Sequence, residues 1–208
     1  MPEQIPNNTL VWHTSQVTPA DRHQLFGQTP VTIWMTGLSG SGKSTLACAL
    51  EARLTAARYA CVVLDGDNIR HGLCSDLGFS DSDRRENIRR VAEVARLMNE
   101  SGLIVITAFI SPFRSDRQMA ADIIGTDRFW EIYLSAPIGV CEQRDPKGFY
   151  QRARRGEISQ FTGISSPYEA PENPTASLDT GIVQLDECVK YVLQRIDKFL
   201  KPPPGSTG

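Results

Sequence analysis

Gly37-Leu38-Ser39-Gly40-Ser41-Gly42-Lys43-Ser44-Thr45 decides the fold, because this stretch fits the phosphate-binding template G-x-x-x-x-G-K-[ST]. The apolar, β-branched run at 31–36 predicts a buried strand before it, and residues 46–57 predict a helix after it. A strand, a glycine-rich loop and a helix in this order surround a phosphate with backbone N–H groups. Lys43 then adds a charge for the β- and γ-phosphates, and the Ser44 hydroxyl is a ligand for Mg²⁺. The alternative is a glycine-rich turn that only joins two elements.

Composition and charge exclude several classes of protein. The 208 residues are enough for one α/β domain with short tails, and 22 basic against 24 acidic residues create no overall field for nucleic acid or a membrane. Five scattered cysteines without a C-x-x-C pair argue against a disulfide framework or a zinc site. We see no signal-peptide pattern and no apolar run near the roughly 20 residues that span a bilayer. We therefore expect a cytoplasmic protein with reduced thiols.

Strands alternate with helices along the chain. Apolar runs at 59–64, 103–108 and 129–134 predict three further strands. An apolar stripe after Asp83 predicts a helix that Gly102 closes. This alternation is typical of an α/β fold with a parallel sheet, whose loops gather at the carboxyl ends of the strands.

The chain divides into three parts. We interpret residues 1–28 as an irregular N-terminal arm, 29–200 as the domain and 201–208 as a disordered tail. Within the domain, residues 145–176 replace any apolar period with basic residues, glycines and prolines, as a lid over an active site does. A terminal helix is expected to pack through the stripe Leu185, Val189, Val192 and Ile196.

Two carboxylates follow the second predicted strand. Asp65 and Asp67 lie in the sequence DGDN, at the same edge of the sheet as the phosphate loop. They are suited to hold Mg²⁺, to orient an attacking hydroxyl or to accept its proton, and Asp67 is the better candidate for the reacting centre. The alternative is that these residues only cap a helix and make a turn.

A basic segment with one aromatic residue follows. Arginine binds phosphate or sulfate oxygens through a planar fork, and an aromatic ring offers a face to a base, so the segment suggests a second, nucleotide-like substrate. The alternative is that these arginines are exposed to solvent on a helix and pair with Glu86 and Glu93. This applies above all to Arg89 and Arg90. The residues concerned are Arg70, Phe79, Arg84, Arg85, Asn87, Arg89 and Arg90.

Further candidates lie after the third strand and in the lid. Ser111, in the sequence Phe109-Ile110-Ser111-Pro112, either carries a phosphoryl group or binds substrate, or is a plain helix N-cap. Lys147, with Arg152, Arg154 and Arg155 beyond it, either closes on a triphosphate or belongs to a solvated basic loop. Phe161 either stacks on a base or attaches the lid to the core.

Five motifs in this order closely resemble those of the adenylylsulfate kinase family. They read GLSGSGKST, LDGDNIRHGLCSDLGFSDSDRRENIRR, TAFISPFR, DPKGFYQRARRGEI and FTGISSPYEAPENP. With the N-terminal VWH at 11–13, the resemblance extends over roughly residues 11–180. The resemblance implies a P-loop kinase fold with a parallel five-stranded sheet, in which the strand after the phosphate loop is not an immediate neighbour of the strand before it. It further implies ATP-dependent phosphorylation of the 3′-hydroxyl of adenylyl sulfate, with Mg²⁺, in a homodimer. Since 208 residues leave no room for a sulfurylase domain, we expect adenylyl sulfate to come from a separate ATP sulfurylase.

The resemblance also implies roles for single residues. The phosphate loop is expected to bind ATP, and Ser111 corresponds to a phosphoserine position of the family. Together with the chemistry argued above, this gives Lys43, Asp67 and Ser111 as expected catalytic residues and Ser44 and Asp65 as expected Mg²⁺ ligands. Phe79 and Phe161 are expected to enclose the adenine of adenylyl sulfate. The full set of expected adenylyl sulfate contacts is Asp67, Arg70, Phe79, Arg84, Asn87, Ile110, Ser111, Lys147 and Phe161.

Two departures and three rivals accompany this prediction. Ser159-Gln160 stands where the family often has a basic residue, and Arg155 where it usually has a small one. The rivals are a kinase of another small molecule, such as a nucleotide monophosphate or a sugar acid, a nucleotide-dependent switch, and a silent regulatory subunit. The D-x-x-G match at 122–125, typical of switches, falls in a predicted helix and has no N-K-x-D partner.

Overall fold

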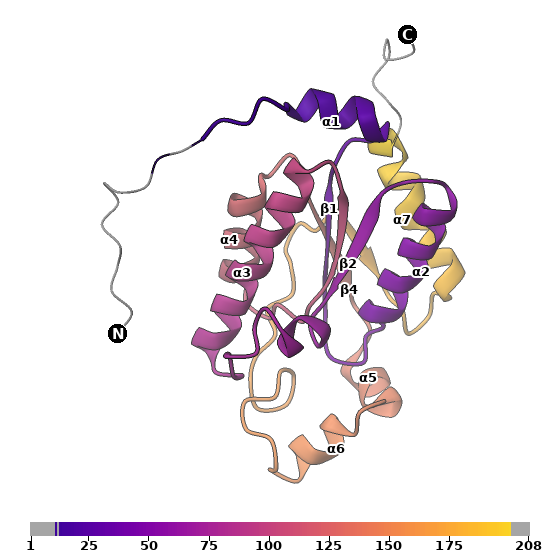
Figure 1. The fold of residues 1–208 in the computed structure, drawn as a ribbon. Coiled ribbons are helices and arrows are strands. Elements are labelled where there is room, and N and C mark those ends of the chain that lie inside the picture. Colours follow the sequence, from indigo (N-terminus) through magenta and orange to yellow (C-terminus); the bar gives the residue numbers. More distant parts are fainter. Residues whose placement is uncertain (1–10, 12, 201–208) are drawn as a thin grey trace.

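A parallel sheet of five strands lies at the centre of the molecule, between two layers of helices (Figure 1). The computed structural model describes residue 11 and residues 13–200, with the side chains of 198–200 outside this description. The strands are β1 (Thr32–Thr36), β2 (Cys61–Asp65), β3 (Ile104–Ala108), β4 (Phe129–Leu134) and β5 (Ala176–Leu178). The helices are α1 (Pro19–Phe26), α2 (Lys43–Ala56), the short 3₁₀-helix η2 (Asn68–His71), α3 (Asp81–Glu100), α4 (Arg114–Ile124), α5 (Ile138–Arg144), α6 (Phe149–Arg154) and α7 (Leu185–Leu200).

The strand order is β2-β3-β1-β4-β5, and all neighbours are parallel. The expected α/β class, the five strands and the separation of β1 from β2 are therefore confirmed. Because β1 is the central strand, its carboxyl end places the phosphate loop between the loops that follow β3 and β4. D-x-x-G residues 122–125 overlap the end of α4, as predicted.

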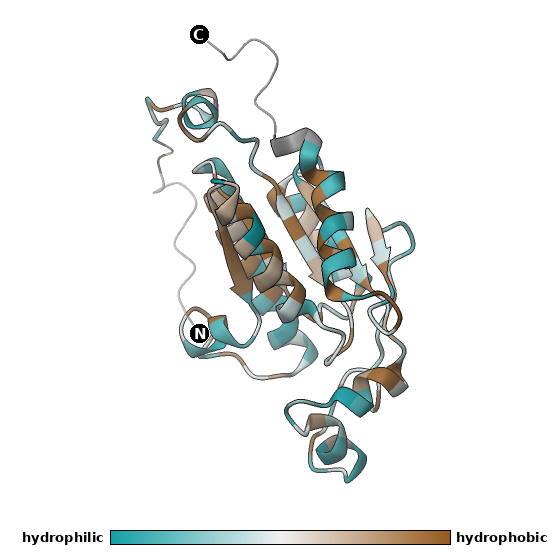
Figure 2. Cartoon of the chain, turned by 90° about the vertical axis from the view of Figure 1, so that its right-hand side faces the viewer, coloured by the Kyte–Doolittle hydropathy of each residue, from teal (hydrophilic) through white to brown (hydrophobic). Residues whose placement is uncertain are grey.

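Alternation along β1 divides the core into two layers. Ile33 and Met35 pack with α2 and α7, whereas Trp34, between them, packs with α3 and α4 on the other face. In Figure 2 the strands are largely hydrophobic, and the helices beside them carry both hydrophobic and hydrophilic residues. Of the predicted stripe of α7, Val189, Val192 and Ile196 are buried here together with Cys188, whereas Leu185, at the start of the helix, is 41% exposed and lies outside this core.

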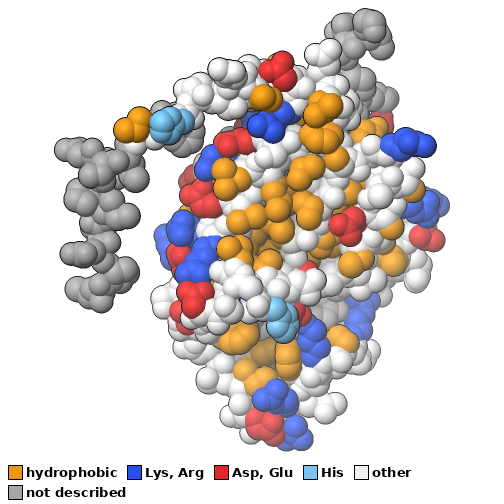
Figure 3. Space-filling view, viewed as in Figure 1, with side chains coloured by type: hydrophobic (Ala, Val, Ile, Leu, Met, Phe, Trp, Pro, Cys, Tyr) orange, Lys and Arg blue, Asp and Glu red, His pale blue; other side chains and the backbone are white. Residues whose placement is uncertain are grey.

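β2 forms one edge of the sheet and is only partly covered. All five of its residues are half-buried, in contrast to the fully buried β1 and β3. Figure 3 shows hydrophobic side chains in a band on this face, between the positions of α3 and α2. An uncovered apolar edge of this kind is a surface on which another chain can dock.

Residues 19–26 correct the prediction of an irregular arm, because they form α1. The Thr18 side chain accepts from the N–H of Asp21 at 3.2 Å, and the Asp21 carboxylate accepts from the N–H of Thr18 at 2.7 Å, which together make a capping box. Pro19 occupies the first turn and Gly27 closes the helix in the left-handed region. α1 buries no residue, so the apolar period that reveals most helices is missing from its sequence. Residues 1–10, 12 and the predicted tail at 201–208 lie outside the described residues.

The lid has more structure than its sequence predicts. α5, α6 and the segment up to Ile164 project beyond the carboxyl ends of the strands and share a small core of their own (Figure 1). Cys141, Tyr150 and Phe161 are buried in it. α6 has only six residues, too few for a recognisable period.

Candidate active site

The phosphate loop joins β1 to α2 in a conformation that requires glycine. Gly37 has φ +147°, and a Cβ there would lie 2.6 Å from the carbonyl oxygen of Leu134. Gly40 has φ +74°, and a Cβ there would lie 2.9 Å from the carbonyl oxygen of Cys141. Gly42 precedes α2 without a side-chain cap, so the first N–H groups of this helix remain available to an anion. The interpretation as a mere connecting turn does not explain these features.

Side chains from outside the loop hold its carbonyl groups. Three such bracing residues donate to successive carbonyl oxygens, Tyr150 to Ser39 at 2.9 Å, Arg144 to Gly40 at 3.3 Å and Thr180 to Ser41 at 2.7 Å. The N–H of a peptide group points away from its carbonyl. Since the carbonyls of Ser39 and Ser41 face these donors, the N–H groups of Gly40 and Gly42 face the opposite way, toward the inside of the loop, whereas the N–H of Ser41 donates to the carbonyl of Leu38 at 3.2 Å.

Lys43 is the first residue of α2 and is only 8% exposed. Its Nζ donates to the carbonyl oxygens of Gly37 at 2.8 Å and Leu38 at 2.6 Å. Burial lowers the pKa of Lys43 to about 8. The loop's own carbonyls therefore hold the ammonium group inside the cradle that the template predicts for phosphates.

Ser44 and Asp65 meet across two separate elements. The Ser44 hydroxyl donates to Oδ2 of Asp65 at 2.6 Å, while Oδ1 of Asp65 accepts from the N–H of Asp67 at 2.9 Å. Asp65 thus makes the turn that its sequence allowed and also faces the phosphate loop. A hydroxyl and a carboxylate suit Mg²⁺, which takes oxygen ligands and completes its shell with water and phosphate oxygens. Within the described residues no group of three or more His, Cys, Asp or Glu side chains is arranged to hold a metal.

Asp67 and Lys147, both predicted site residues, form an ion pair between the end of β2 and the loop before α6. Both side chains are about half exposed or more. Asp67 precedes η2 but makes no side-chain cap bond, so the predicted alternative of a helix cap does not hold for it. Because Asp67 also donates its N–H to Asp65, the ion pair connects the lid to one of the two predicted Mg²⁺ ligands.

Arg70 and Phe79 lie together on the segment before α3. The Arg70 guanidinium lies 4.4 Å from the centroid of the Phe79 ring and donates to the carbonyl of Gly78 at 2.9 Å. Phe79 is 65% exposed, so nothing in the fold requires an aromatic ring here. An exposed ring beside a half-buried cation, whose pKa burial lowers, is a surface that a planar anionic ligand would cover.

Arg84 connects this segment to the lid. Its Nε donates to the carbonyl of Phe79 at 2.9 Å, Nη1 donates to the Thr162 hydroxyl at 2.6 Å, and Nη2 donates to the carbonyl of Gln160. Because it is Gln160's carbonyl that accepts, the contact does not depend on the side chain at 160. The departure at Ser159-Gln160 is therefore compatible with a bound lid.

Phe161 follows Gln160 and is 8% exposed. Its ring meets Tyr150 edge to face, with centroids 4.9 Å apart. Phe161 is thus packed in the small cluster that the lid shares with Leu38 of the phosphate loop, and not in the two core clusters on either face of the sheet. Its stacking on a base stays a prediction.

Two further predicted contact residues, Asn87 and Ile110, lie on α3 and in the loop after β3. Asn87 is buried on α3, and among the described residues its Nδ2 has no hydrogen-bond partner. The nearby Cys74 thiol, whose pKa burial raises, is at most a weak acceptor for it. Ile110 offers its carbonyl to the Thr36 hydroxyl at 2.8 Å, which ties the loop after β3 to the end of β1.

Ser111 is 3% exposed and has φ +37°, in the left-handed region that non-glycine residues rarely adopt. Its hydroxyl oxygen accepts from the indole N–H of Trp34 at 3.2 Å. The N-cap alternative is wrong, because α4 begins at Arg114 after Phe113. Arg117 fixes the backbone of this loop by donating to the carbonyl of Ser111 at 2.7 Å.

Comparison with known proteins adds the family. A sequence family described as adenylylsulphate kinase matches residues 29–179. This chain belongs to the adenylylsulphate kinase family. The adenylyl-sulfate kinase of Vibrio cholerae is 56% identical over 92% of this chain and 88% of its own.

Solved structures agree with this assignment. A Mycobacterium tuberculosis APS kinase, CysC, in complex with AMPPNP and APS is similar with a TM-score of 0.78 and 44% identity over 82% of this chain and 99% of that chain. A hexameric APS kinase from Thiobacillus denitrificans is similar with a TM-score of 0.63 and 33% identity, over 86% of this chain and 31% of that chain. The resemblance read from the five motifs is confirmed, and the rival families are not supported.

Other charged residues of this kinase match their plainer interpretations. Arg89 and Arg90 pair with Glu86 on the surface of α3, as the helix pattern allowed. In the lid, Arg154 pairs with Glu142, and Arg152 and Arg155 both pair with Glu157. Lys147 is thus the basic residue of this group that reaches a predicted catalytic carboxylate.

Sequence reasoning missed the bracing residues Arg144, Tyr150 and Thr180, as well as Arg117. The three bracing residues lie more than 100 positions from the loop that they support, so no local pattern marks them. Arg117 lies only six positions from Ser111, but an arginine on a helix is read as a surface residue unless the fold is known. A tyrosine in a short helix and a threonine after a strand are common in any α/β protein. Only the folded arrangement identifies these residues.

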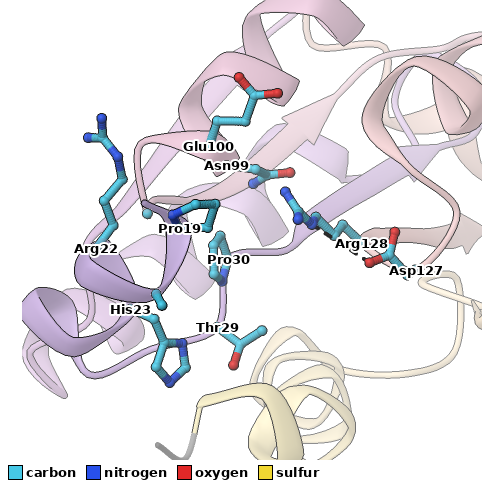
Figure 4. A pocket seen from close by; sticks show the side chains of 11 residues that line it. Pro19, Arg22, His23, Thr29, Pro30, Asn99, Glu100, Asp127 and Arg128 are labelled. Atoms are coloured by element: carbon cyan, nitrogen blue, oxygen red, sulfur yellow. Dashed lines mark ion pairs between the residues drawn. The ribbon is translucent and has the colours of Figure 1, made fainter. Parts of the chain in front are cut away.

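A separate hollow of about 460 Å³ lies at the amino ends of the strands. Figure 4 shows Arg22 and His23 of α1 on one side of it and the ion pair of Arg128 with Asp127 on the other. Its lining residues Thr29 and Pro30 directly precede β1, whose opposite end carries the phosphate loop. The hollow is therefore separate from the kinase site.

None of the helices in the described part of the chain combines the length and apolar character needed to cross a membrane.

Proposed function

We propose that this kinase transfers the γ-phosphoryl group of ATP to the 3′-hydroxyl of adenylyl sulfate, giving 3′-phosphoadenylyl sulfate and ADP. The observation that carries the proposal is the Arg84 bridge, because it connects the exposed Phe79 to the lid that also donates to the phosphate loop. The relative bound to AMPPNP and APS supports the same two ligands here.

ATP is proposed to bind residues 37–45, with Lys43 near the β- and γ-phosphates. The Lys43 ammonium group already lies within the loop, so little reorganisation precedes charge neutralisation. Ser44 and Asp65 would hold Mg²⁺, which neutralises charge on the phosphate oxygens when bound. Their oxygens, 2.6 Å apart, are the donor type that this ion requires.

Adenylyl sulfate is proposed to bind on the other side of the reacting centre. Phe79 and Phe161 would enclose its adenine, while Arg70 and Arg84 would contact its phosphate or sulfate oxygens. Asn87 has an unpaired buried N–H donor that a bound ligand would satisfy. Ile110, Ser111 and Lys147 complete the proposed contacts.

Asp67 is proposed to orient or deprotonate the 3′-hydroxyl. Its carboxylate is largely exposed, so the hydroxyl can reach it, and Lys147 is its present partner. Exchange of Lys147 from Asp67 to an anionic oxygen of a substrate would free the carboxylate to accept the hydroxyl proton. In-line transfer from ATP to the hydroxyl then needs no covalent intermediate.

Ser111 is proposed to support the site without carrying the phosphoryl group. Its burial and its contact with Trp34 leave the hydroxyl no open approach to ATP in this conformation. Its backbone, held by Arg117, contributes to the acceptor side of the site.

We further propose a cytoplasmic homodimer that uses adenylyl sulfate made by a separate ATP sulfurylase. All five cysteines are free thiols, which suits a reducing compartment. The half-buried apolar edge at β2 supports association with a second copy. Light scattering coupled to size-exclusion chromatography tests the dimer directly.

The decisive test is ADP release by the purified chain with Mg²⁺, ATP and adenylyl sulfate. We expect ADP to form only with adenylyl sulfate present, and phosphorus NMR of the product to place the new phosphate on the 3′-oxygen. A panel of nucleotide monophosphates and sugar acids is the control. Turnover with one of those acceptors, but not with adenylyl sulfate, would contradict the proposal.

A further inference from the structure

Tyr150 contacts both halves of the proposed site. It is 2% exposed on α6, and its hydroxyl donates to the carbonyl of Ser39 in the phosphate loop at 2.9 Å. The ring of Tyr150 also makes the edge-to-face contact with Phe161. Burial raises the pKa of Tyr150, so its phenol remains a hydrogen-bond donor throughout the working pH range.

A second contact runs parallel to the first. A Cβ on Gly163 would lie 3.0 Å from Cδ2 of Leu38, so the lid backbone packs directly on a phosphate-loop side chain. Leu38 also packs on the lid core formed by Cys141, Tyr150 and Phe161. The lid and the loop therefore share one small packed unit, and packed units of this kind change arrangement together.

Arg84 extends this unit to the acceptor side. Its guanidinium donates to Thr162, the residue after Phe161, and to the carbonyl of Phe79. A series of contacts thus leads from Phe79 to Arg84, from Arg84 to the two chain neighbours of Phe161, and from the Phe161 ring to Tyr150 and Ser39. A ligand between Phe79 and Phe161 bears on the ring that contacts Tyr150.

We propose that Tyr150 is a positioning residue through which adenylyl sulfate and ATP each strengthen the binding of the other. The inference rests on the proposed function, because it takes Phe161 as part of the acceptor pocket. A ligand stacked on Phe161 fixes the Tyr150 ring, and the fixed hydroxyl holds the Ser39 carbonyl outward, with the next N–H turned to the phosphates. By linkage, ATP orders the same contacts and favours adenylyl sulfate by the same factor.

The test is a pair of calorimetric titrations with the non-hydrolysable analogue AMPPNP and Mg²⁺, without and with saturating adenylyl sulfate. For the unaltered chain we expect the Kd of AMPPNP to fall about fivefold or more when adenylyl sulfate is bound. Tyr150→Phe keeps the ring and its packing but removes the hydroxyl donor. In this variant the ratio of the Kd of AMPPNP without adenylyl sulfate to the Kd with it should fall below about twofold.

Two control variants separate coupling from general weakening. Thr180→Val removes the donor to Ser41, which is not part of the series from Phe161, so it should weaken AMPPNP equally with and without adenylyl sulfate. Tyr59→Phe, just before β2 and outside the series of contacts, should keep the full ratio. Thermal unfolding of each variant verifies that it is folded at the titration temperature.

The outcomes distinguish the inference from the function on which it rests. The inference would be overturned if adenylyl sulfate lowered the Kd of AMPPNP as much in Tyr150→Phe as in the unaltered chain. It would also be overturned if the unaltered chain bound adenylyl sulfate but its Kd for AMPPNP did not change. Either result leaves the proposed function intact. Failure of the unaltered chain to bind adenylyl sulfate at all would overturn both.

Discussion

The Ser44 hydroxyl donates to Oδ2 of Asp65 at 2.6 Å, although β3 lies between the strands that lead to these two residues. The contact is possible because all strands are parallel and end at one edge of the sheet. It brings together the two protein oxygens that we propose for Mg²⁺.

Asp65→Asn should raise the Mg²⁺ concentration for half-maximal turnover by about tenfold or more, because a neutral amide is a weaker ligand than a carboxylate. The measurement is ADP release against Mg²⁺ at saturating ATP and adenylyl sulfate. Asp122→Asn, an equivalent change on the exposed surface of α4, should leave the curve in place. An unchanged Mg²⁺ requirement in Asp65→Asn would remove Asp65 from the metal site.

Lys43→Met should lower kcat by about 100-fold or more, as loss of one preorganised charged donor does at other active sites. Methionine keeps the apolar stem in the loop, so we expect the circular dichroism spectrum to stay unchanged. Lys190→Met, on α7, is the matched control and should retain turnover. Near-normal kcat in Lys43→Met would show that the loop does not serve phosphoryl transfer.

ATP binding should take up a proton above pH 8. The pKa of Lys43 is about 8 in the free chain, and a nearby triphosphate raises it, so near pH 9 the complex binds more protons than the separate partners. The affinity for AMPPNP should therefore decline as the pH rises from 8 to 9.5. Calorimetry in two buffers of different ionisation enthalpy measures the uptake, which should disappear in Lys43→Met and at pH 6.5.

Phe79→Ala and Phe161→Ala should differ in their effect on the stability of the fold. Phe79 is exposed, so its loss should leave the unfolding temperature nearly unchanged and raise the half-saturating concentration of adenylyl sulfate about tenfold. Phe161 is buried against Tyr150, so its loss should also destabilise the chain by about 3 kcal/mol. Thermal unfolding and initial rates test both, and an unaltered half-saturating concentration in Phe79→Ala would place the adenine elsewhere.

Ser111→Ala should keep kcat within about threefold while lowering stability by about 1–3 kcal/mol, because the buried Trp34 N–H loses its acceptor. Chemical unfolding and ADP release from the same preparation provide the two values. A folded variant whose kcat drops more than 100-fold would instead favour a phosphoserine intermediate.

The sequence reveals those parts of the fold that depend on local pattern. The apolar run before Gly37 identified β1, and the glycine-lysine spacing identified the loop, because both follow from the chemistry of a few adjacent residues. α1 stayed hidden since it buries nothing, and α6 since it is too short for a period.

The site divides in the same way. Arg84 was recognised as a ligand candidate, but its bridge to Thr162 joins residues 78 positions apart. Asp65 was open to two interpretations, and the structure satisfies both, one through each carboxylate oxygen. Pairings between distant segments depend on topology, which no single stretch of sequence contains.

The three donors to the phosphate-loop carbonyls come from α5, α6 and the segment after β5, so the nucleotide cradle is assembled from pieces spread over much of the chain. Anyone who wishes to graft the lid of a homologue onto this enzyme must transplant positions 144, 150 and 180 as a set. A chimera that carries foreign side chains at only some of them would inherit a loop whose peptide groups are free to turn over.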